Sequence, residues 1–233
     1  MSLLDVKIKK AGYKQNMEII RDIEFSIRRS ELVGMIGANG AGKSTTIKSI
    51  LEQLAFVEGE IHREENSTYS YIPERPVFYD ELTLWEHFEF VAAVENLHDS
   101  SLIYAKELLK KFHLLQHIHE FPNTFSKGMQ QKGMTVLALF TKPDLLIIDE
   151  PFMGLDPAST ILLLNMIEEE RNKGTGILMC THILDTAQRI CDSFVIIEQG
   201  TMKAAGTLET VLEKCNATDG TLYSCLSLEG DTE

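Results

Sequence analysis

The stretch Gly37-Ala38-Asn39-Gly40-Ala41-Gly42-Lys43-Ser44 has the spacing G-x-x-x-x-G-K-S of a phosphate-binding loop. A strand-like apolar run, 32–36, precedes it, and a helix-like run, 45–51, follows it. Backbone N–H groups of residues 39–43 can therefore point at phosphate oxygens, at a helix N-terminus whose dipole favours anions. Lys43 adds a positive charge, and the Ser44 hydroxyl can bind Mg²⁺. The loop predicts a protein that binds a nucleoside triphosphate.

Composition limits the class of protein. The chain has 233 residues, of which 44% are hydrophobic and 24% charged, as in a globular protein of one large domain or two joined lobes. Its net charge of -13 argues against broad nucleic-acid binding, which needs a basic face, so we expect no nucleic-acid partner. The cysteines have no C-x-x-C spacing, which favours a reducing cytosol over a disulfide framework or a zinc site. No apolar run of about 18 residues is present, so another chain would have to supply a membrane span.

Periodicity along the chain predicts an α/β fold. Runs at 3–9 and 23–36 have strand patterns, and strands alternate with helices between 145 and 197, as in a mostly parallel sheet with crossover helices. Between these parts, a capping-box pattern at Thr83 opens a helix to about Asn96, and further helical periodicity runs over 102–119. We therefore expect a helical subdomain at about 77–135.

Two regions carry weaker signals. The polar, turn-rich sequence from Cys215 onward predicts a loosely packed tail, 214–233. His113, His117 and His119 have spacings that metal ligands also use, but no carboxylate or cysteine pattern accompanies them. We therefore favour a solvated helix face there.

An apolar run, 145–148, ends in the acidic pair Asp149 and Glu150. This pattern predicts carboxylates at the carboxyl edge of a parallel sheet, where ligands of α/β folds bind. Asp149 can reach Mg²⁺ directly or through water, and Glu150 can polarise a water aimed at the γ-phosphate. Acidic residues often end strands, and here the pair gains its functional interpretation from the phosphate-binding loop earlier in the chain.

Taken together, these motifs resemble those of ATP-binding-cassette (ABC) ATPases over residues 1 to about 213. They follow the family's order, with a signature-like segment at 125–131, the acidic pair, a D-loop at 154–156 and a switch histidine at His182. The resemblance implies a P-loop NTPase of ABC type, in which a mixed sheet joins an N-terminal antiparallel β lobe and a helical subdomain. The chain is most similar to the bacterial Ecs-type ATP-binding subunits, which are exporter-type cassettes.

The resemblance also implies roles for individual residues. Catalysis falls to Glu150 and His182, and Mg²⁺ binding to Ser44, Glu74 and Asp149. The ATP-binding set is Tyr13, Gly37, Asn39, Gly40, Ala41, Gly42, Lys43, Ser44, Thr45, Ser126 and Gly128. Tyr13 would stack on adenine, while Ser126 and Gly128, at a helix start, would bind ATP held by a second copy of the chain. Glu74 departs from the family, because many members have Gln there.

The function implied is ATP hydrolysis, with ATP and Mg²⁺ as cofactors, by a subunit that powers a separate membrane-spanning permease, in the direction of export. The chain would lie in the cytoplasm, on the inner face of the cell membrane. One alternative is a non-transport ABC ATPase acting on ribosomes or DNA, and another is a regulatory module that binds ATP without hydrolysing it. Kinase and GTPase assignments fit the phosphate-binding loop alone, but neither explains the segment at Ser126.

Three aromatic residues, Trp85, Phe88 and Phe90, begin the helix that follows Glu74. They can line a groove for a short helix of the permease, or they can face the core of their own subdomain. The sequence leaves both interpretations open.

Overall fold

The computed structural model describes residues 2–15 and 17–226. The strands are β1 (Ser2–Gly12), β2 (Ile20–Arg28), β3 (Leu32–Ile36), β4 (Phe56–Arg63), β5 (Tyr69–Ile72), β6 (Leu145–Asp149), β7 (Gly176–Cys180), β8 (Ser193–Glu198) and β9 (Thr201–Gly206). The α-helices are α1 (Lys43–Ile50), α2 (Leu84–Val94), α3 (Asp99–Lys111), α4 (Lys127–Leu139), α5 (Pro157–Lys173), α6 (Leu184–Ile190) and α7 (Leu208–Lys214). Short 3₁₀ helices are η1 (Leu115–His117), η2 (Pro122–Thr124) and η3 (Leu222–Cys225).

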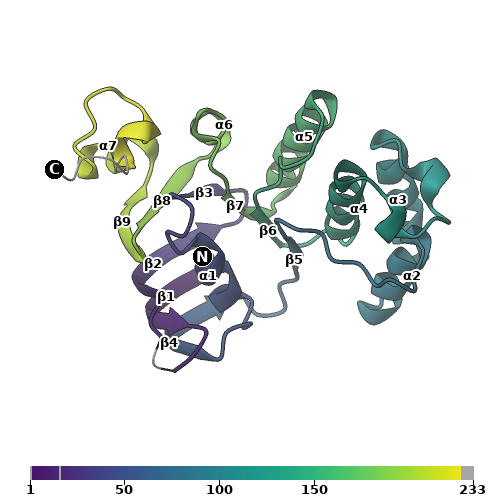
Figure 1. Ribbon diagram of the computed structural model, residues 1–233, viewed down its shortest axis with the longest axis horizontal. Helices are drawn as coiled ribbons and strands as arrows, with labels where there is room; N and C mark the ends of the chain where they lie inside the picture. Colours follow the sequence, from purple (N-terminus) through teal and green to yellow (C-terminus); the bar gives the residue numbers. More distant parts are fainter. Residues whose placement is uncertain (1, 16, 227–233) are drawn as a thin grey trace.

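The strands form one mixed sheet in the order β4-β1-β2-β9-β8-β3-β7-β6-β5. β5, β6, β7, β3 and β8 run parallel, and helices connect most of them, while β4, β1 and β2 are antiparallel. The predicted α/β class with a mixed sheet is confirmed. Figure 1 shows α2, α3 and α4 together at one end of the molecule and α7 at the other.

Strand register brings three loops to one edge of the sheet. Met35 near the end of β3 and Asp149 at the end of β6 both pair with Cys180 at the end of β7. The chain therefore leaves all three strands at the same level, and the segments beginning at Gly37, Glu150 and Thr181 start side by side. This alignment builds the functional site.

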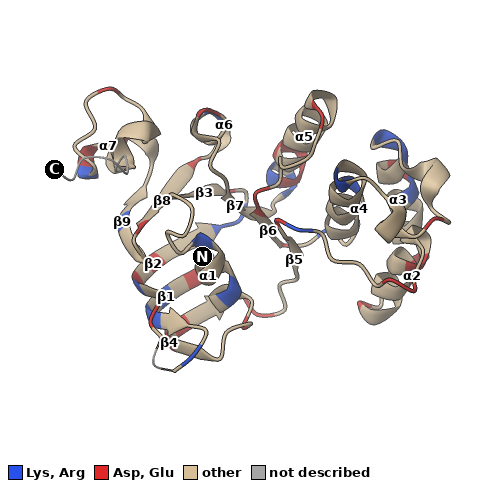
Figure 2. Ribbon diagram, viewed as in Figure 1, with Lys and Arg blue, Asp and Glu red and all other residues tan. Residues whose placement is uncertain are grey.

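The N-terminal sheet carries alternating buried and charged residues. Lys7 of β1 pairs with Glu24 of β2 across the exposed face at 2.9 Å. Figure 2 shows Lys and Arg spread over β1, α3, α4 and α5 rather than gathered on one element. The run at 23–36, which has strand patterns in the sequence, covers parts of two strands, β2 and β3, because the chain turns at Ser30, whose φ is 59°.

The helical segment begins as the sequence predicts. Thr83 caps α2 in a complete capping box with Glu86. The second helix ends earlier than expected, because α3 stops at Lys111 and His113 adopts a φ of 57°. His113 and His117 therefore do not share a helix face, and His117 instead contacts Glu120 at 2.9 Å.

The expectation of a loosely packed tail is wrong for residues 215–226. Leu222 and Cys225 of η3 are fully buried. They lie in one apolar cluster with Leu184 and Ala187 of α6 and Val211 of α7. Residues 227–233 of the predicted tail lie outside the described part of the chain.

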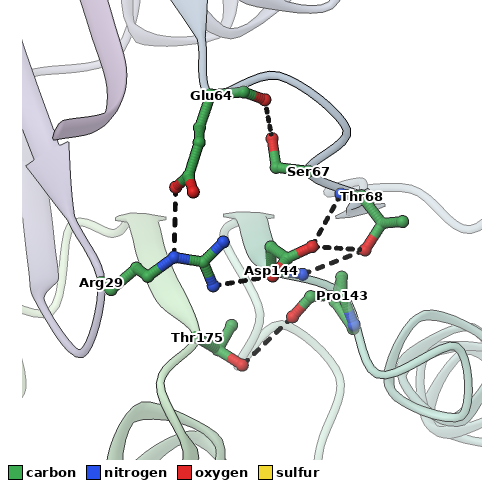
Figure 3. Close-up of polar contacts among 7 residues, drawn as sticks. All are labelled: Arg29, Glu64, Ser67, Thr68, Pro143, Asp144 and Thr175. Atoms are coloured by element: carbon green, nitrogen blue, oxygen red, sulfur yellow. Dashed lines mark hydrogen bonds and ion pairs between the residues drawn. The ribbon is translucent and has the colours of Figure 1, made fainter. Parts of the chain in front are cut away.

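A polar network joins the antiparallel strands to the parallel strands near the starts of β5 and β6 (Figure 3). Arg29, in the turn after β2, contacts Glu64 at 3.1 Å and Asp144 at 2.7 Å. Asp144 also accepts hydrogen bonds from the backbone N–H and the hydroxyl of Thr68. The network ties the turn before β3 to the starts of β5 and β6, and thereby fixes the strands whose other ends carry the site.

Candidate functional site

The phosphate-binding loop runs from Gly37 to Gly42 and delivers the chain into α1. Gly42 is the residue before the helix and has a φ of 113°, a conformation that side-chain-bearing residues rarely adopt. No side chain caps this helix N-terminus within the described part of the chain. Its first N–H groups are therefore available to an anion. The Ala41 N–H, within the loop, is already used, since it donates a hydrogen bond to Ala38 O at 3.1 Å.

Lys43 is held inside the curve of the loop. Its Nζ donates to Gly37 O at 2.7 Å and to Ala38 O at 3.1 Å, and only 6% of the residue is exposed. The ammonium group thus sits among carbonyl oxygens of the loop itself, where an anion bound to the loop would meet its charge.

Ser44 and Asp149 meet although 105 residues separate them. The Ser44 hydroxyl donates to Asp149 Oδ2 at 3.1 Å. The pair joins the start of α1 to the end of β6 and presents two oxygen donors at one point. Oxygen donors of this kind suit Mg²⁺, which is usually held by one or two protein groups together with substrate phosphates and water. The residues present therefore fit a magnesium ion.

The environment of Asp149 disfavours its charge. The residue is 3% exposed, and burial raises the pKa of its carboxyl above the ordinary value. The negative charges of Glu150 and Glu74 raise this pKa further, whereas the Ser44 hydrogen bond and the charge of Lys43 lower it. A bound cation would relieve this unfavourable charge.

Glu150 and His182 form a second pair at the same edge. His182 Nδ1 lies 2.7 Å from Glu150 Oε2, and the His182 backbone N–H is 3.4 Å from the same oxygen. Glu150 has a φ of 49° and its backbone N–H donates to Cys180 O, so the strained turn directs this side chain toward the end of β7. The Glu150 side chain is 12% exposed and that of His182 is 56% exposed.

Glu74 lies after β5 and is exposed. Its charge raises the pKa of the Asp149 carboxyl, which places the two residues within electrostatic reach of each other. Tyr13 lies in the turn after β1 and is also exposed, with its ring 5.1 Å from Lys48 Nζ of α1. Thus Glu74 lies near the acidic edge, and Tyr13 lies beside the helix that the phosphate-binding loop opens.

Ser126 and Gly128 lie at the start of α4, in the helical segment. Ser126 caps the helix by accepting a hydrogen bond from Met129 N at 3.3 Å. Gly128 lies so close to the following loop that an added Cβ would be 2.6 Å from Gly154 O. Within the described residues, neither Ser126 nor Gly128 has a hydrogen bond to the phosphate-binding loop of its own chain. The structure therefore brings Ser44, Asp149, Glu150 and His182 together and leaves this pair apart.

Sequence reasoning missed Lys132, which links α4 to the D-loop. Lys132 Nζ donates to Asp156 Oδ2 at 2.8 Å, and Asp156 also accepts from Ser159 N at the start of α5. The Lys132 contact and then the Ser159 bonds hold the pKa of Asp156 well below its ordinary value. No local pattern reveals this pair, because its members are 24 residues apart.

The aromatic residues of α2 divide between core and surface. Phe88 is fully buried and packs against Phe140, and Trp85 is half-buried and stacks on Phe88. Phe90 is 46% exposed and contacts Tyr79, which is exposed as well. The groove interpretation is therefore wrong for Phe88 and stays open for Phe90. Among the described residues, no helix is long and apolar enough to cross a membrane.

Comparison with known proteins gives a consistent result. The model of the ABC transporter family matches residues 20–153. The chain is 46% identical over 233 residues to the ABC transporter ATP-binding protein YthP of Bacillus subtilis (strain 168), and this match covers 99% of the chain and 98% of YthP. It is 41% identical to the ABC-type transporter ATP-binding protein EcsA of the same organism, over 95% of the chain and 94% of EcsA.

Solved structures agree with this pattern. One described as the ATP-binding subunit of an ABC transporter matches with a TM-score of 0.88 and 41% identity, over 96% of the chain and 98% of that structure. A nucleotide-free ATP-binding cassette matches with a TM-score of 0.74 at 20% identity, which shows a common fold. The resemblance to Ecs-type subunits and the expected fold are confirmed.

Proposed function

The chain belongs to the ABC transporter family, and we propose that it powers a separate membrane-spanning permease by hydrolysing Mg-ATP in a sandwich of two copies. It is an ATP-binding ATPase of that family. The observation that carries the proposal is the meeting of Ser44 with Asp149 and of Glu150 with His182 at one edge of the sheet. A nucleotide-binding loop beside an acid and a histidine supplies the groups for hydrolysis as well as for binding.

Each residue has a role that follows from its chemistry. The loop from Gly37 to Gly42 and the N-terminus of α1, including Thr45, bind the phosphates, and Lys43 neutralises their charge. Ser44 and Asp149, with Glu74 nearby, hold Mg²⁺, which when bound neutralises negative charge on the phosphate oxygens. Tyr13 offers an aromatic face to the adenine ring.

Glu150 accepts the proton of the attacking water in this proposal. A carboxylate is a suitable base when it is positioned beside the water, and the contact with His182 Nδ1 orients the Oε2 atom. His182 is in turn more exposed than Glu150, so it can contact the γ-phosphate region while it holds the glutamate. Position and hydrogen bonding thus assign proton transfer to Glu150 and orientation to His182.

The second copy completes the site. Ser126 and Gly128 lie at a helix start, where N–H groups and a hydroxyl favour a phosphate, yet in the described part of the chain no hydrogen bond joins them to the loop of their own chain. A second chain that presents this helix start across the nucleotide would place two binding sites between two copies.

Export across a membrane is the direction we propose. One relative, the linearmycin resistance ATP-binding protein LnrL of Bacillus subtilis (strain 168), is 31% identical over 97% of the chain and 75% of its own length. Resistance is consistent with removal of a compound from the cell, and we extend that direction to this chain. The subunit would then act on the cytoplasmic face of the membrane, bound to its permease.

The test combines hydrolysis with association. We expect the purified chain to release phosphate from ATP when Mg²⁺ is present, and a tagged chain to co-purify from detergent-solubilised membranes with an integral membrane protein. ATP binding without phosphate release, by the chain alone and with that protein, would support the regulatory alternative. Equal or faster turnover of GTP would contradict the ATPase assignment.

A further inference from the structure

Two cysteine residues lie near each other at the end of the molecule that carries α7, opposite the end that carries α2, α3 and α4 (Figure 1). Cys215 follows α7 and Cys225 ends η3. Both groups approach one acceptor, because Cys215 N donates to Val211 O at 2.9 Å and Cys225 Sγ lies 3.8 Å from the same oxygen. Cys215 also packs against the apolar cluster that contains Cys225, and its side chain is close enough to affect the pKa of the Cys225 thiol.

The two thiols differ in exposure. Cys225 is fully buried in the apolar cluster of α6, α7 and β8, whereas Cys215 is half-buried at the rim of that cluster. A small reagent can therefore reach Cys215 first, and the buried Cys225 is the thiol beside it. This arrangement of an accessible cysteine next to a second one is the arrangement of reversible thiol oxidation.

The segment between the cysteines holds α6. Gln188 Nε2 donates to Gly220 O at 3.0 Å, and Leu222 N donates to Gln188 Oε1 at 3.2 Å. Tyr223 OH lies 3.5 Å from Asp185 Oδ2 at the start of the same helix. Because α6 begins two residues after His182, a conformational change in residues 216–224 would act on the helix that directly follows this histidine.

We propose that Cys215 and Cys225 are a redox modification site, at which a hydroperoxide converts the two thiols to a disulfide that closes residues 216–224 against α6. The proposal goes beyond ATP hydrolysis and does not depend on it. In a reducing cytosol such a bond is transient, as expected of a sensing rather than a structural disulfide.

The chemistry balances with the hydroperoxide as oxidant. The Cys215 thiolate attacks the distal peroxide oxygen, so that an S–O bond forms, the O–O bond breaks, and the alkoxide leaves and takes up a proton as the alcohol. Cys225 sulfur then attacks the Cys215 sulfenic acid, an S–S bond forms, and water leaves with the thiol proton. Two thiols and one hydroperoxide give one disulfide, one alcohol and one water.

The order of attack agrees with the electrostatics. Burial, and after it the interaction with Cys215, raise the pKa of the Cys225 thiol to about 12, although the charge of Lys203 opposes this shift. Cys225 is therefore a poor nucleophile at neutral pH, and the first attack falls to Cys215. In the second step, the closeness of the Cys215 sulfenic acid compensates for the small thiolate fraction of Cys225.

The test is peptide mapping of the full chain after treatment with hydrogen peroxide and alkylation of free thiols. We expect a linked pair of peptides containing Cys215 and Cys225, with a loss of about 2 Da relative to the two thiols and reversal by dithiothreitol. Deuterium exchange of the amides in 216–226 should become slower in the oxidised protein. These readouts require no nucleotide, so their failure is separable from failure of the ATPase assignment.

Variants make the result decisive. In Cys225→Ser, and in Cys225→Ala should the serine variant misfold, hydrogen peroxide should leave a Cys215 sulfenic acid that dimedone traps, while the parent chain gives disulfide. The control Cys191→Ala should still form the bond. Alkylation of both thiols after peroxide treatment, oxidation of Cys215 to the sulfinic acid in the parent chain, or a bond to Cys191 would overturn the proposal.

Discussion

His182 Nδ1 lies 2.7 Å from Glu150 Oε2, although 32 residues separate the two side chains. The contact joins the turn after β6 to the loop after β7, so the orientation of the proposed base depends on two neighbouring strands. Burial differs across the pair, because the glutamate is largely enclosed and the histidine is exposed. The glutamate is therefore the group to change first.

We expect Glu150→Gln to lower ATP hydrolysis by about 10² or more while ATP binding is kept, because the amide cannot accept a proton. Mg-ATP should then hold a dimer of the variant, which size-exclusion chromatography measures. The matched control is Glu169→Gln, at an exposed position of α5, which should behave as the parent chain. Activity near the parent level together with a monomer in Mg-ATP would remove Glu150 from catalysis.

Lys43→Ala should lose ATP binding and, with it, turnover. The substitution removes the positive charge held inside the phosphate-binding loop, where Nζ contacts two loop carbonyls. Equilibrium titration with a fluorescent ATP analogue measures the affinity. Lys9→Ala, at an exposed position of β1, serves as the control for loss of one charge. Unchanged affinity in Lys43→Ala would defeat the assignment of the loop.

Asp149→Asn should raise the thermal midpoint of unfolding in the absence of nucleotide and abolish the further rise that Mg-ATP gives the parent chain. The pKa of Asp149 is higher in the folded state than in the unfolded state, where it is near 3.8. The free energy of unfolding therefore falls as the pH rises from the unfolded-state pKa toward the folded-state pKa. An uncharged amide removes this cost at neutral pH. Thermal unfolding with and without Mg-ATP measures both effects, and a lower midpoint without nucleotide would contradict the electrostatic argument.

The network around Asp144 should make the free energy of unfolding depend on pH in the acidic range. Hydrogen bonds from Thr68 and then Arg29 lower the folded-state pKa of this carboxyl. The stability that the Asp144 carboxylate contributes is fully present above the unfolded-state pKa of 3.8 and is lost as the pH falls through the lower folded-state pKa. Asp144→Asn should thus cost on the order of 1 kcal/mol at pH 7, and the difference from the parent should shrink below about pH 4. Urea unfolding at several pH values measures it, and a constant difference would exclude the carboxylate as the cause.

The aromatic residues of α2 should separate folding from docking. Phe88→Ser should destabilise the fold by about 3–5 kcal/mol, because it empties a fully buried site beside Phe140. Phe90→Ser should leave the thermal midpoint near that of the parent and reduce co-purification with the permease, since Phe90 lies on the exposed face with Tyr79. A folded Phe90→Ser protein that retains the permease would remove this face from the docking surface.

Local sequence patterns determined much of the fold. The apolar strands before Gly37 and Glu150, the glycines of the phosphate-binding loop and the capping box at Thr83 are short-range features, and each element begins close to its predicted residue. Such features depend on backbone conformation and on neighbours within a few residues, so they can be recognised in a single sequence. The mistakes lie where tertiary contacts decide. The sequence shows a polar tail after Cys215, yet Leu222 and Cys225 supply the apolar cover of α6.

The candidate site divides in the same way. The sequence alone identified Lys43, Ser44, Asp149, Glu150 and His182 as candidates, because residue type and order carry the motifs. Only the tertiary structure decided that Ser44 bonds Asp149, that Glu150 bonds His182 and that Lys132 holds Asp156. The physical reason for the first two contacts is the sheet register, which brings the ends of β3, β6 and β7 to one level and so joins groups that are 32 and 105 residues apart along the chain. The third contact joins α4 to the loop before α5.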